Sequence, residues 1–159
     1  MEIVRGNLSD PKFLSSKMES CDAVFHSAAY VAVENINIPL MHEINVVGTK
    51  NICRAALDAN IPKLIHFSSV HAFQQTPTDE PLDEHRPLVS NKNAPPYDKS
   101  KAEAQHVIYN ACNKGLNAVI LHPTGIIGPY DFKPSRMGKV LLDIMKKKMI
   151  FCRDYLVQN

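Results

Sequence analysis

The chain has 159 residues and a mass of 17.8 kDa, which is enough for one ordinary domain and too little for two. Hydrophobic residues make up 45% and charged residues 21%, a balance that excludes a disordered segment. The net charge of +2 gives no reason to expect a nucleic-acid partner, and no apolar run reaches the roughly 18 residues that span a bilayer. The first residues also lack the pattern of a secretory signal, so we expect a cytoplasmic domain.

Four cysteines and seven histidines are scattered along the chain. None of them forms the paired spacing of a zinc site, so we predict no metal. The cysteines are expected to be ordinary thiols in a reducing compartment.

Predicted strands and helices alternate along the chain. In order they are a strand over 2–8, a helix over 11–19, a strand over 23–29, a helix over 40–59, a strand over 63–67, a helix over 97–114, a strand over 117–122, and an amphipathic helix from 137 to the lysines at 146–148. Three residues are placed to cap helices: Asp10 at a start, and Asn60 and Gly115 at ends. Residues 70–96 form an unusually long polar loop, which indicates a functional or mobile segment.

This alternation predicts an α/β fold, a doubly wound parallel sheet with right-handed crossovers. The predicted strands are apolar throughout rather than alternating, as expected for strands that are buried on both faces. Such sheets bind ligands at the carboxyl ends of their strands. The segments that follow the strands are therefore the candidate site, namely Gly6-Asn7, Ser27 to Ala29, Ser68-Ser69 and Pro123-Thr124.

Tyr97 and Lys101 stand four residues apart at a helix start, so their side chains share one face of its first turn. A free phenol has a pKa of about 10, and a nearby ammonium group lowers that value by stabilising the phenolate. The spacing alone also occurs in helices where the tyrosine packs and the lysine is solvated. Ser69 strengthens the interpretation. It lies at the end of the preceding predicted strand, where its hydroxyl could polarise the substrate carbonyl group on which Tyr97 would act.

With these residues in place, the chain resembles an extended short-chain dehydrogenase/reductase of the NAD-dependent epimerase/dehydratase family, and among its members it is most similar to dihydroflavonol-4-reductase-like proteins. The matching segments are Gly6 to Asp10, Asp22 to Ala29, Asn45 to Asn51, Phe67 to Val70, Pro96 to Glu103, Pro123 to Pro129 and Asp131 to Lys139. The resemblance implies an NAD(P)-binding Rossmann-type fold, with residues 1–149 a partial domain and 150–159 a tail.

The resemblance also implies roles for individual residues. Tyr97 would be the acid–base group, Lys101 would lower its pKa and bind the nicotinamide ribose, Ser69 would hydrogen-bond the substrate carbonyl, and Asn45 would support a proton relay. Ser69 is preferred to Ser68 because Phe73, four residues after Ser69, occupies the aromatic position of the motif. Besides Tyr97 and Lys101, the residues implied to contact NAD or NADP are Asn7, Leu8, Ala28, Ala29, Ser68, Pro123 and Ile126.

Three departures from the family pattern stand out. Asn7 replaces the usual Asp, and His122 replaces the usual Arg before the proline. No G-x-x-G-x-x-G sequence occurs in the 159 residues, and residue 2 already enters what resembles the third strand. The pyrophosphate-binding turn of a dinucleotide fold is therefore missing from this sequence.

Two functions stay open at this point. The first is an oxidoreductase or epimerase that acts on a small carbonyl or alcohol compound or a sugar nucleotide, impaired in the isolated chain by truncation. The second is a non-catalytic remnant that binds a partner or metabolite. Neither NAD nor NADP is favoured, and the resemblance leaves room for a homodimer.

Overall fold

The computed structural model describes residues 2–32, 36–132 and 135–146. In chain order the elements are α1 (Pro11–Met18), β1 (Val24–His26), α2 (Ile38–His42), a π-helical turn (Glu43–Val47), α3 (Gly48–Asp58), β2 (Leu64–Phe67), a 3-10 turn (Val70–Ala72), α4 (Pro96–Cys112), β3 (Ala118–Leu121) and α5 (Arg136–Met145). The chain divides into two compact units at Pro123, and each is described by itself.

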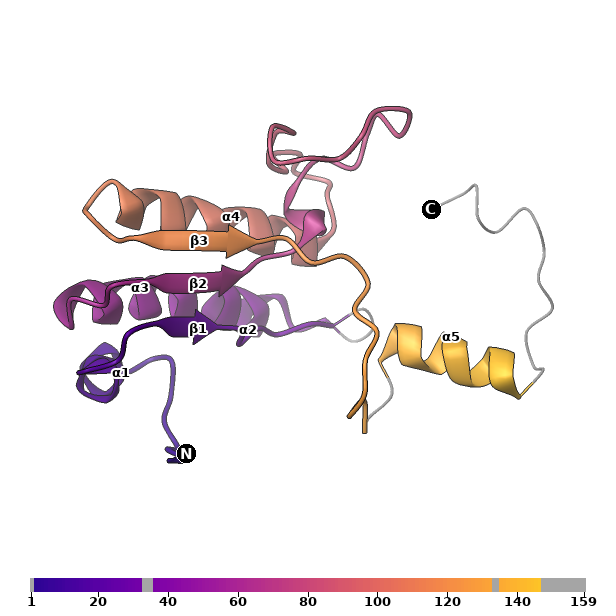
Figure 1. Cartoon of the computed structure of the whole chain (residues 1–159). Coiled ribbons are helices and arrows are strands. Elements are labelled where there is room, and N and C mark those ends of the chain that lie inside the picture. The colour runs from indigo at the N-terminus through magenta and orange to yellow at the C-terminus, as the bar shows by residue number, and fades with distance from the viewer. Residues whose placement is uncertain (1, 33–35, 133–134, 147–159) are drawn as a thin grey trace. The chain divides into compact units, whose positions relative to one another are not determined.

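The first unit is built on a three-stranded parallel sheet in the order β1-β2-β3. Val24 lies opposite Leu64, and Leu64 lies opposite Ala118, so the three strands run in register. Helices α3 and α4 connect successive strands and lie side by side behind the sheet (Figure 1). The predicted parallel α/β sheet is therefore confirmed, in an incomplete form.

The core lies between this sheet and its helices. Leu64 on β2 and Ile108 on α4 are fully buried, and Ile52 on α3 packs in the same cluster. Side chains on the other face of the sheet are exposed, with Phe25 at 67% and Val119 and Leu121 each at 41%. The described helices thus bury one face of the sheet and leave the other face apolar and open.

The predicted strand over residues 2–8 is wrong, because these residues form no strand. A strand needs a neighbour to accept and donate its main-chain hydrogen bonds, and none of the three described strands pairs with this segment. Leu8 instead contacts α3, where the amide of Asn51 donates to its main-chain oxygen at 2.7 Å.

Most predicted helix ends are confirmed. The Asp10 carboxylate accepts the main-chain N–H of Phe13 at 3.0 Å, and Asn60 and Gly115 adopt φ values of 52° and 100°. The helix expected over 40–59 begins earlier, at Ile38, because the Asn37 side chain caps it. Its π-helical turn was not predicted from the sequence.

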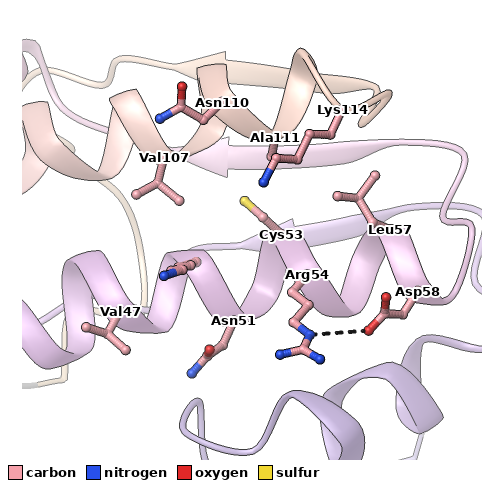
Figure 2. A pocket seen from close by; sticks show the side chains of 11 residues that line it. Val47, Asn51, Cys53, Arg54, Leu57, Asp58, Val107, Asn110, Ala111 and Lys114 are labelled. Carbon is pink, nitrogen blue, oxygen red and sulfur yellow. Dashed lines mark ion pairs between the residues drawn. The ribbon is translucent and has the colours of Figure 1, made fainter.

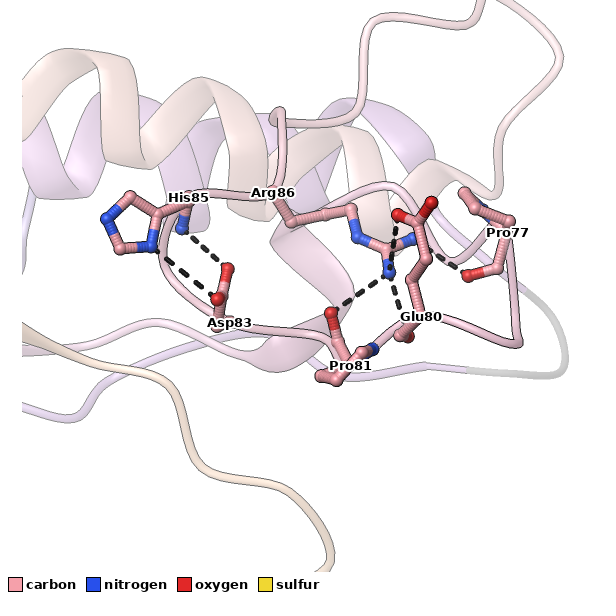
Figure 3. A network of polar contacts seen from close by, with 6 residues as sticks. All are labelled: Pro77, Glu80, Pro81, Asp83, His85 and Arg86. Carbon is pink, nitrogen blue, oxygen red and sulfur yellow. Dashed lines mark hydrogen bonds and ion pairs between the residues drawn. The ribbon is translucent and has the colours of Figure 1, made fainter.

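The long loop before α4 is organised around Arg86, whose side chain is largely buried (Figure 3). Its guanidinium donates to the main-chain oxygens of Pro77, Glu80 and Pro81 at 2.9, 2.9 and 3.1 Å. A planar group with five donors can hold several carbonyl groups at once, so one side chain fixes the path of this loop.

The second unit contains α5, which begins after Ser135. The Ser135 hydroxyl accepts the main-chain N–H of Gly138 at 3.0 Å, and the Asp131 carboxylate accepts the N–H of Ser135. The predicted tail 150–159 lies outside the described residues. Within the described parts of both units, no helix has the length and apolar character that crossing a membrane requires.

Candidate active site

Ser69, Tyr97 and Lys101 meet where β2 ends and α4 begins. Ser69 follows β2 by two residues and caps the 3-10 turn, while Tyr97 and Lys101 lie in the first two turns of α4. The Lys101 ammonium lies 5.9 Å from the centre of the Tyr97 ring. The structure therefore brings together three of the four side chains that were predicted to act in catalysis, the fourth being Asn45.

Burial raises the pKa of the Tyr97 phenol, and a hydrogen bond with the Ser69 side chain opposes that shift. The expected lowering of this pKa by Lys101 is therefore not what the structure gives. The physical reason is that the half-buried phenol loses hydration, which disfavours the phenolate. At neutral pH the Tyr97 side chain is consequently a proton donor.

Lys101 is almost fully buried, at 4% exposure, and burial lowers its pKa. Its ammonium donates to the main-chain oxygen of Phe67 at 3.1 Å, the one hydrogen bond that it makes within the described residues. An ammonium has three donors, so two remain for hydroxyl groups such as those of a ribose. This donor set fits the nicotinamide-ribose end of NAD(P), whereas the 159 residues hold no glycine-rich turn for the pyrophosphate.

Asn45 lies in the π-helical turn and is buried. Its side chain accepts the N–H of Tyr30 at 2.7 Å and donates to the Tyr30 oxygen at 3.1 Å and to the Ser100 hydroxyl at 3.0 Å. Asn45 therefore joins the segment after β1 to α4. A π turn re-aims one side chain within a helix, and such turns are frequent at functional sites.

The two serines after β2 have different surroundings. The Ser68 hydroxyl donates to the Gln105 side-chain oxygen at 3.2 Å, inside the core. The Ser69 hydroxyl instead accepts the main-chain N–H of His71 at 3.2 Å and acts to lower the pKa of Tyr97. The preference for Ser69 as the catalytic serine agrees with these contacts.

The other residues predicted to bind the cofactor are more dispersed. Pro123 lies next to Ser69, since its main-chain oxygen accepts the N–H of Val70 at 3.3 Å. Ala28 is exposed and Ala29 half-buried after β1, while Asn7 is exposed and Leu8 packs on α3. Ile126 is 70% exposed and belongs to the second unit.

Several polar contacts near the site were not predicted from the sequence. His71 pairs with Asp98 next to Tyr97, with 3.5 Å between Nδ1 and Oδ1. Asp98 stands inside a matching segment, one residue after Tyr97, and His71 directly follows another, two residues after Ser69; these positions were the available signal. His122, a departure from the family pattern, lies 2.9 Å from the Gln105 side-chain oxygen.

Two further histidines are buried on neighbouring strands. His26 and His66 lie opposite each other with ring centres 5.1 Å apart. His26 Nε2 lies 3.1 Å from the Thr49 hydroxyl, whereas both ring nitrogens of His66 are buried without a hydrogen bond. Burial lowers the pKa of His26 to about 4 and that of His66 to about 3.

A groove of about 610 Å³ runs between α3 and α4, and Figure 2 shows the side chains that line it. Its charged lining residues are Lys50, Arg54, Asp58 and Lys114. Arg54 pairs with Asp58 at 3.7 Å. None of the predicted catalytic residues lines this groove.

A model of the NAD dependent epimerase/dehydratase family matches residues 1–150. The chain belongs to this family. The resemblance inferred from the sequence motifs is thereby confirmed, and so is the Rossmann-type class of the fold.

Curated members of the epimerase/dehydratase family align with most of the chain. Sterol demethylase protein B of Methylococcus capsulatus is 28% identical over 94% of this chain and 45% of its own length. A protein of Synechocystis sp. named "Putative dihydroflavonol 4-reductase" is 31% identical over 92% and 42% respectively. The chain thus spans less than half the length of these relatives.

Solved structures of similar proteins agree with the fold. The crystal structure of gox2253 superposes with a TM-score of 0.79 at 36% identity, covering 91% of this chain and 44% of that one. DesIV, a dTDP-glucose 4,6-dehydratase from Streptomyces venezuelae with NAD bound, superposes with a TM-score of 0.75 at 25% identity and the same coverage.

Proposed function

We propose that this chain is the catalytic part of an NAD(P)-dependent oxidoreductase or epimerase, and that the favoured reaction is reduction of a ketone to an alcohol. The observation that carries the proposal is the meeting of Ser69, Tyr97 and Lys101 at the end of β2. Two hydroxyl groups and a buried ammonium next to each other suit the polarisation and protonation of a carbonyl oxygen.

Each of these side chains has a distinct role in the proposal. Bound NAD(P)H supplies the hydride. The Ser69 hydroxyl hydrogen-bonds the substrate carbonyl oxygen, and the Tyr97 phenol gives its proton to that oxygen as negative charge develops there. Lys101, whose ammonium lies 5.9 Å from the centre of the Tyr97 ring, would place a positive charge near the phenolate that remains. The protonated Tyr97 phenol can act as the acid in such a reduction.

The cofactor contacts are proposed residue by residue. The free donors of Lys101 would bind the nicotinamide ribose, and Asn45 would support proton transfer beside it. The remaining contacts, carried from the resemblance, are Asn7 and Leu8 near the adenine, Ala28, Ala29 and Ser68 along the cofactor, and Pro123 and Ile126 at the nicotinamide. Whether the cofactor is NAD or NADP is left to the assay.

The substrate is proposed to be a small carbonyl or alcohol compound or a sugar nucleotide. Cinnamoyl-CoA reductase 1 of Petunia hybrida, a reductase by name, is 31% identical over 81% of this chain. DesIV, named as a dTDP-glucose dehydratase, represents the sugar-nucleotide alternative. The preference for ketone reduction follows the resemblance to dihydroflavonol-4-reductase-like proteins, and the Synechocystis relative of that name supports it.

The test is an assay of the chain joined at its N-terminus to a glycine-rich β-α-β segment of a dinucleotide-binding fold, a fusion called the joined protein below. We expect NADH or NADPH oxidation with a ketone substrate, and a loss of about 100-fold or more in Tyr97→Phe. Tyr109→Phe, at the far end of the same helix, is the matched control and should keep its activity. Full activity in Tyr97→Phe would refute the proposed function.

The alternative is a non-catalytic binding protein. One observation favours it, the exposed apolar face around Phe25. Calorimetric titration of the joined protein with NADH and with NADPH discriminates the two functions. If neither cofactor binds, the binding protein is the better conclusion.

We also propose a homodimer and a cytoplasmic location. The groove between α3 and α4 is a poor candidate for the dimer interface. Its lining has three basic residues and one acidic residue, namely Lys50, Arg54, Lys114 and Asp58, so two copies that met there would bring like charges together. Sedimentation velocity at low and high salt tests the dimer, and cell fractionation tests the location.

A further inference from the structure

His71 is coupled to the Ser69 hydroxyl through its main chain. The 3-10 turn that holds His71 begins directly after Ser69, and the His71 N–H donates to the Ser69 Oγ at 3.2 Å. Because the Ser69 oxygen accepts this bond, its own proton stays available for another acceptor. The position of His71 and the orientation of the serine are therefore set together.

The His71 side chain is held by Asp98 against the edge of Tyr97. Nδ1 of His71 lies 3.5 Å from Oδ1 of Asp98, whose side chain is only 10% exposed. The rings of His71 and Tyr97 meet edge to face, with centres 6.3 Å apart. Asp98, Tyr97 and Lys101 are the titratable groups that α4 presents in this region.

The two ends of the imidazole lie in different environments. Asp98 is buried and faces Nδ1, whereas the His71 side chain as a whole is 53% exposed, and Nε2 has no hydrogen-bond partner among the described residues. A carboxylate next to Nδ1 fixes the neutral ring with its proton on that nitrogen, so Nε2 is free to accept or donate a proton. His71 is therefore a half-exposed imidazole that lies beside the Tyr97 ring.

We propose that His71, oriented by Asp98, is the positioning residue through which the Tyr97 phenol exchanges its proton with solvent. The inference rests on the proposed function. After Tyr97 has protonated the substrate oxygen, a proton leaves Nε2 of the protonated imidazole and remakes the phenol O–H bond. The neutral imidazole then takes one proton from solvent, so each carbonyl reduced consumes one proton and no electrons pass through His71.

The chain offers a matched control in His85. Its Nδ1 also lies 3.5 Å from a carboxylate, that of Asp83, but the two side chains are 94% and 55% exposed and lie in the loop before α4. Both pairs thus have the same chemistry and spacing. They differ in the burial of the carboxylate and in the contact with Tyr97.

The first test uses the chain by itself and needs no activity. Nitrogen-15 NMR of labelled histidine, assigned with His71→Gln, reports which ring nitrogen carries the proton. We expect the Nδ1–H form for neutral His71, and a shift toward the Nε2–H form in Asp98→Asn. Asp83→Asn should change His85 far less. The proposal would be overturned if neutral His71 carries its proton on Nε2 and the Asp98→Asn substitution leaves that distribution unchanged.

The second test uses the active joined protein. His71→Ala should lower kcat about tenfold or more with KM nearly unchanged. Imidazole added to the buffer should restore the rate in proportion to its concentration, which a merely structural role would not allow. His85→Ala should show neither effect. If His71→Ala is fully active, or is impaired but not rescued, the inference fails.

The outcome for Tyr97→Phe keeps the two proposals apart. When Tyr97→Phe is inactive and His71→Ala is normal, the proposed function stands and only the role of His71 is lost. When Tyr97→Phe is active, the proposed function itself fails.

Discussion

The Lys101 ammonium donates to the main-chain oxygen of Phe67 at 3.1 Å and so ties the second turn of α4 to the last residue of β2. A charged group that is almost fully buried in this way gives up hydration for one hydrogen bond. Its burial therefore contributes little to stability, which agrees with the role proposed for Lys101 in catalysis.

The first prediction concerns Lys101→Met. We expect the free energy of unfolding to change by only about 1 kcal/mol, since a buried ammonium is replaced by an apolar side chain of similar length. Cofactor binding and activity of the joined protein should fall about 100-fold or more. Lys99→Met is the control, because Lys99 also donates to a main-chain oxygen, that of Lys92 at 3.0 Å, but at the surface. Chemical denaturation and calorimetry measure both variants.

The second prediction compares two asparagines of the same helical segment. Asn45→Ala removes three hydrogen bonds and leaves the main chain of Tyr30 without its partner. Each lost bond costs about 1 kcal/mol, so a loss of about 2–3 kcal/mol is expected. Asn51→Ala removes one bond, to Leu8, and should cost about 1 kcal/mol. Equal losses in the two variants would contradict the structure.

The third prediction concerns acid stability. The pKa values of His26 and His66 in the folded chain, about 4 and about 3, lie below the ordinary value of 6.5. The unfolded chain therefore binds more protons below pH 6.5, and stability is lost as the pH falls from 6.5 toward 4. At pH 5 the loss is expected to be roughly 1–2 kcal/mol for each histidine. Urea unfolding between pH 7.5 and 4.5 tests this.

Leucine substitutions should separate the two histidines. His66→Leu removes two buried nitrogens without partners, so stability at pH 7 should be unchanged or rise by about 1 kcal/mol, with a weaker dependence on pH. His26→Leu also removes the contact with the Thr49 hydroxyl and should be destabilising at pH 7. The opposite order at pH 7 would argue against the described hydrogen bonds.

The fourth prediction concerns the loop before α4. Arg86→Ala removes the donors that hold three main-chain oxygens, so residues 77–86 should become accessible to proteolysis and stability should fall by about 2 kcal/mol. Arg54→Ala serves as control. It breaks only an exposed pair with Asp58, four residues away, which contributes about 0.5 kcal/mol or less. Limited proteolysis and thermal unfolding compare the two variants.

The fifth prediction concerns the open face of the sheet. Phe25, Val119 and Leu121 form exposed apolar surface, which favours association of the isolated chain. Phe25→Thr should reduce self-association and dye binding while keeping the strand. Phe132→Thr is the control, because Phe132 is 88% exposed but belongs to the second unit. Light scattering that is unchanged in Phe25→Thr would show that this face is not the cause.

Local sequence chemistry determined much of the fold. Runs of apolar residues indicated the three strands, because parallel strands under helices need apolar side chains whatever their neighbours are. Asp10, Asn60 and Gly115 marked helix ends correctly, since caps depend on a few adjacent main-chain groups. The strand predicted over residues 2–8 was wrong because strand formation there does not depend on local chemistry alone. Its apolar residues can form a strand only where another strand lies beside them.

The same distinction between local and long-range contacts applies to the candidate active site. Tyr97 and Lys101 could be found from the sequence because one helix turn sets their spacing, and motif order then led to Ser69. The direction in which the Tyr97 pKa shifts could not be predicted from the sequence, because it depends on burial by segments far away in the chain. The pairing of His71 with Asp98 joins two segments across the long loop, and only the tertiary structure decided it.

The sequence by itself thus determined the class of fold and the family and indicated the candidate catalytic side chains, all of which depend on short-range spacing and composition. The tertiary structure decided which nitrogen and oxygen atoms meet, which charges are buried and which face of the sheet is open. These properties arise from contacts between residues that are distant in the chain, and hydration, hydrogen bonding and pKa all follow from such contacts.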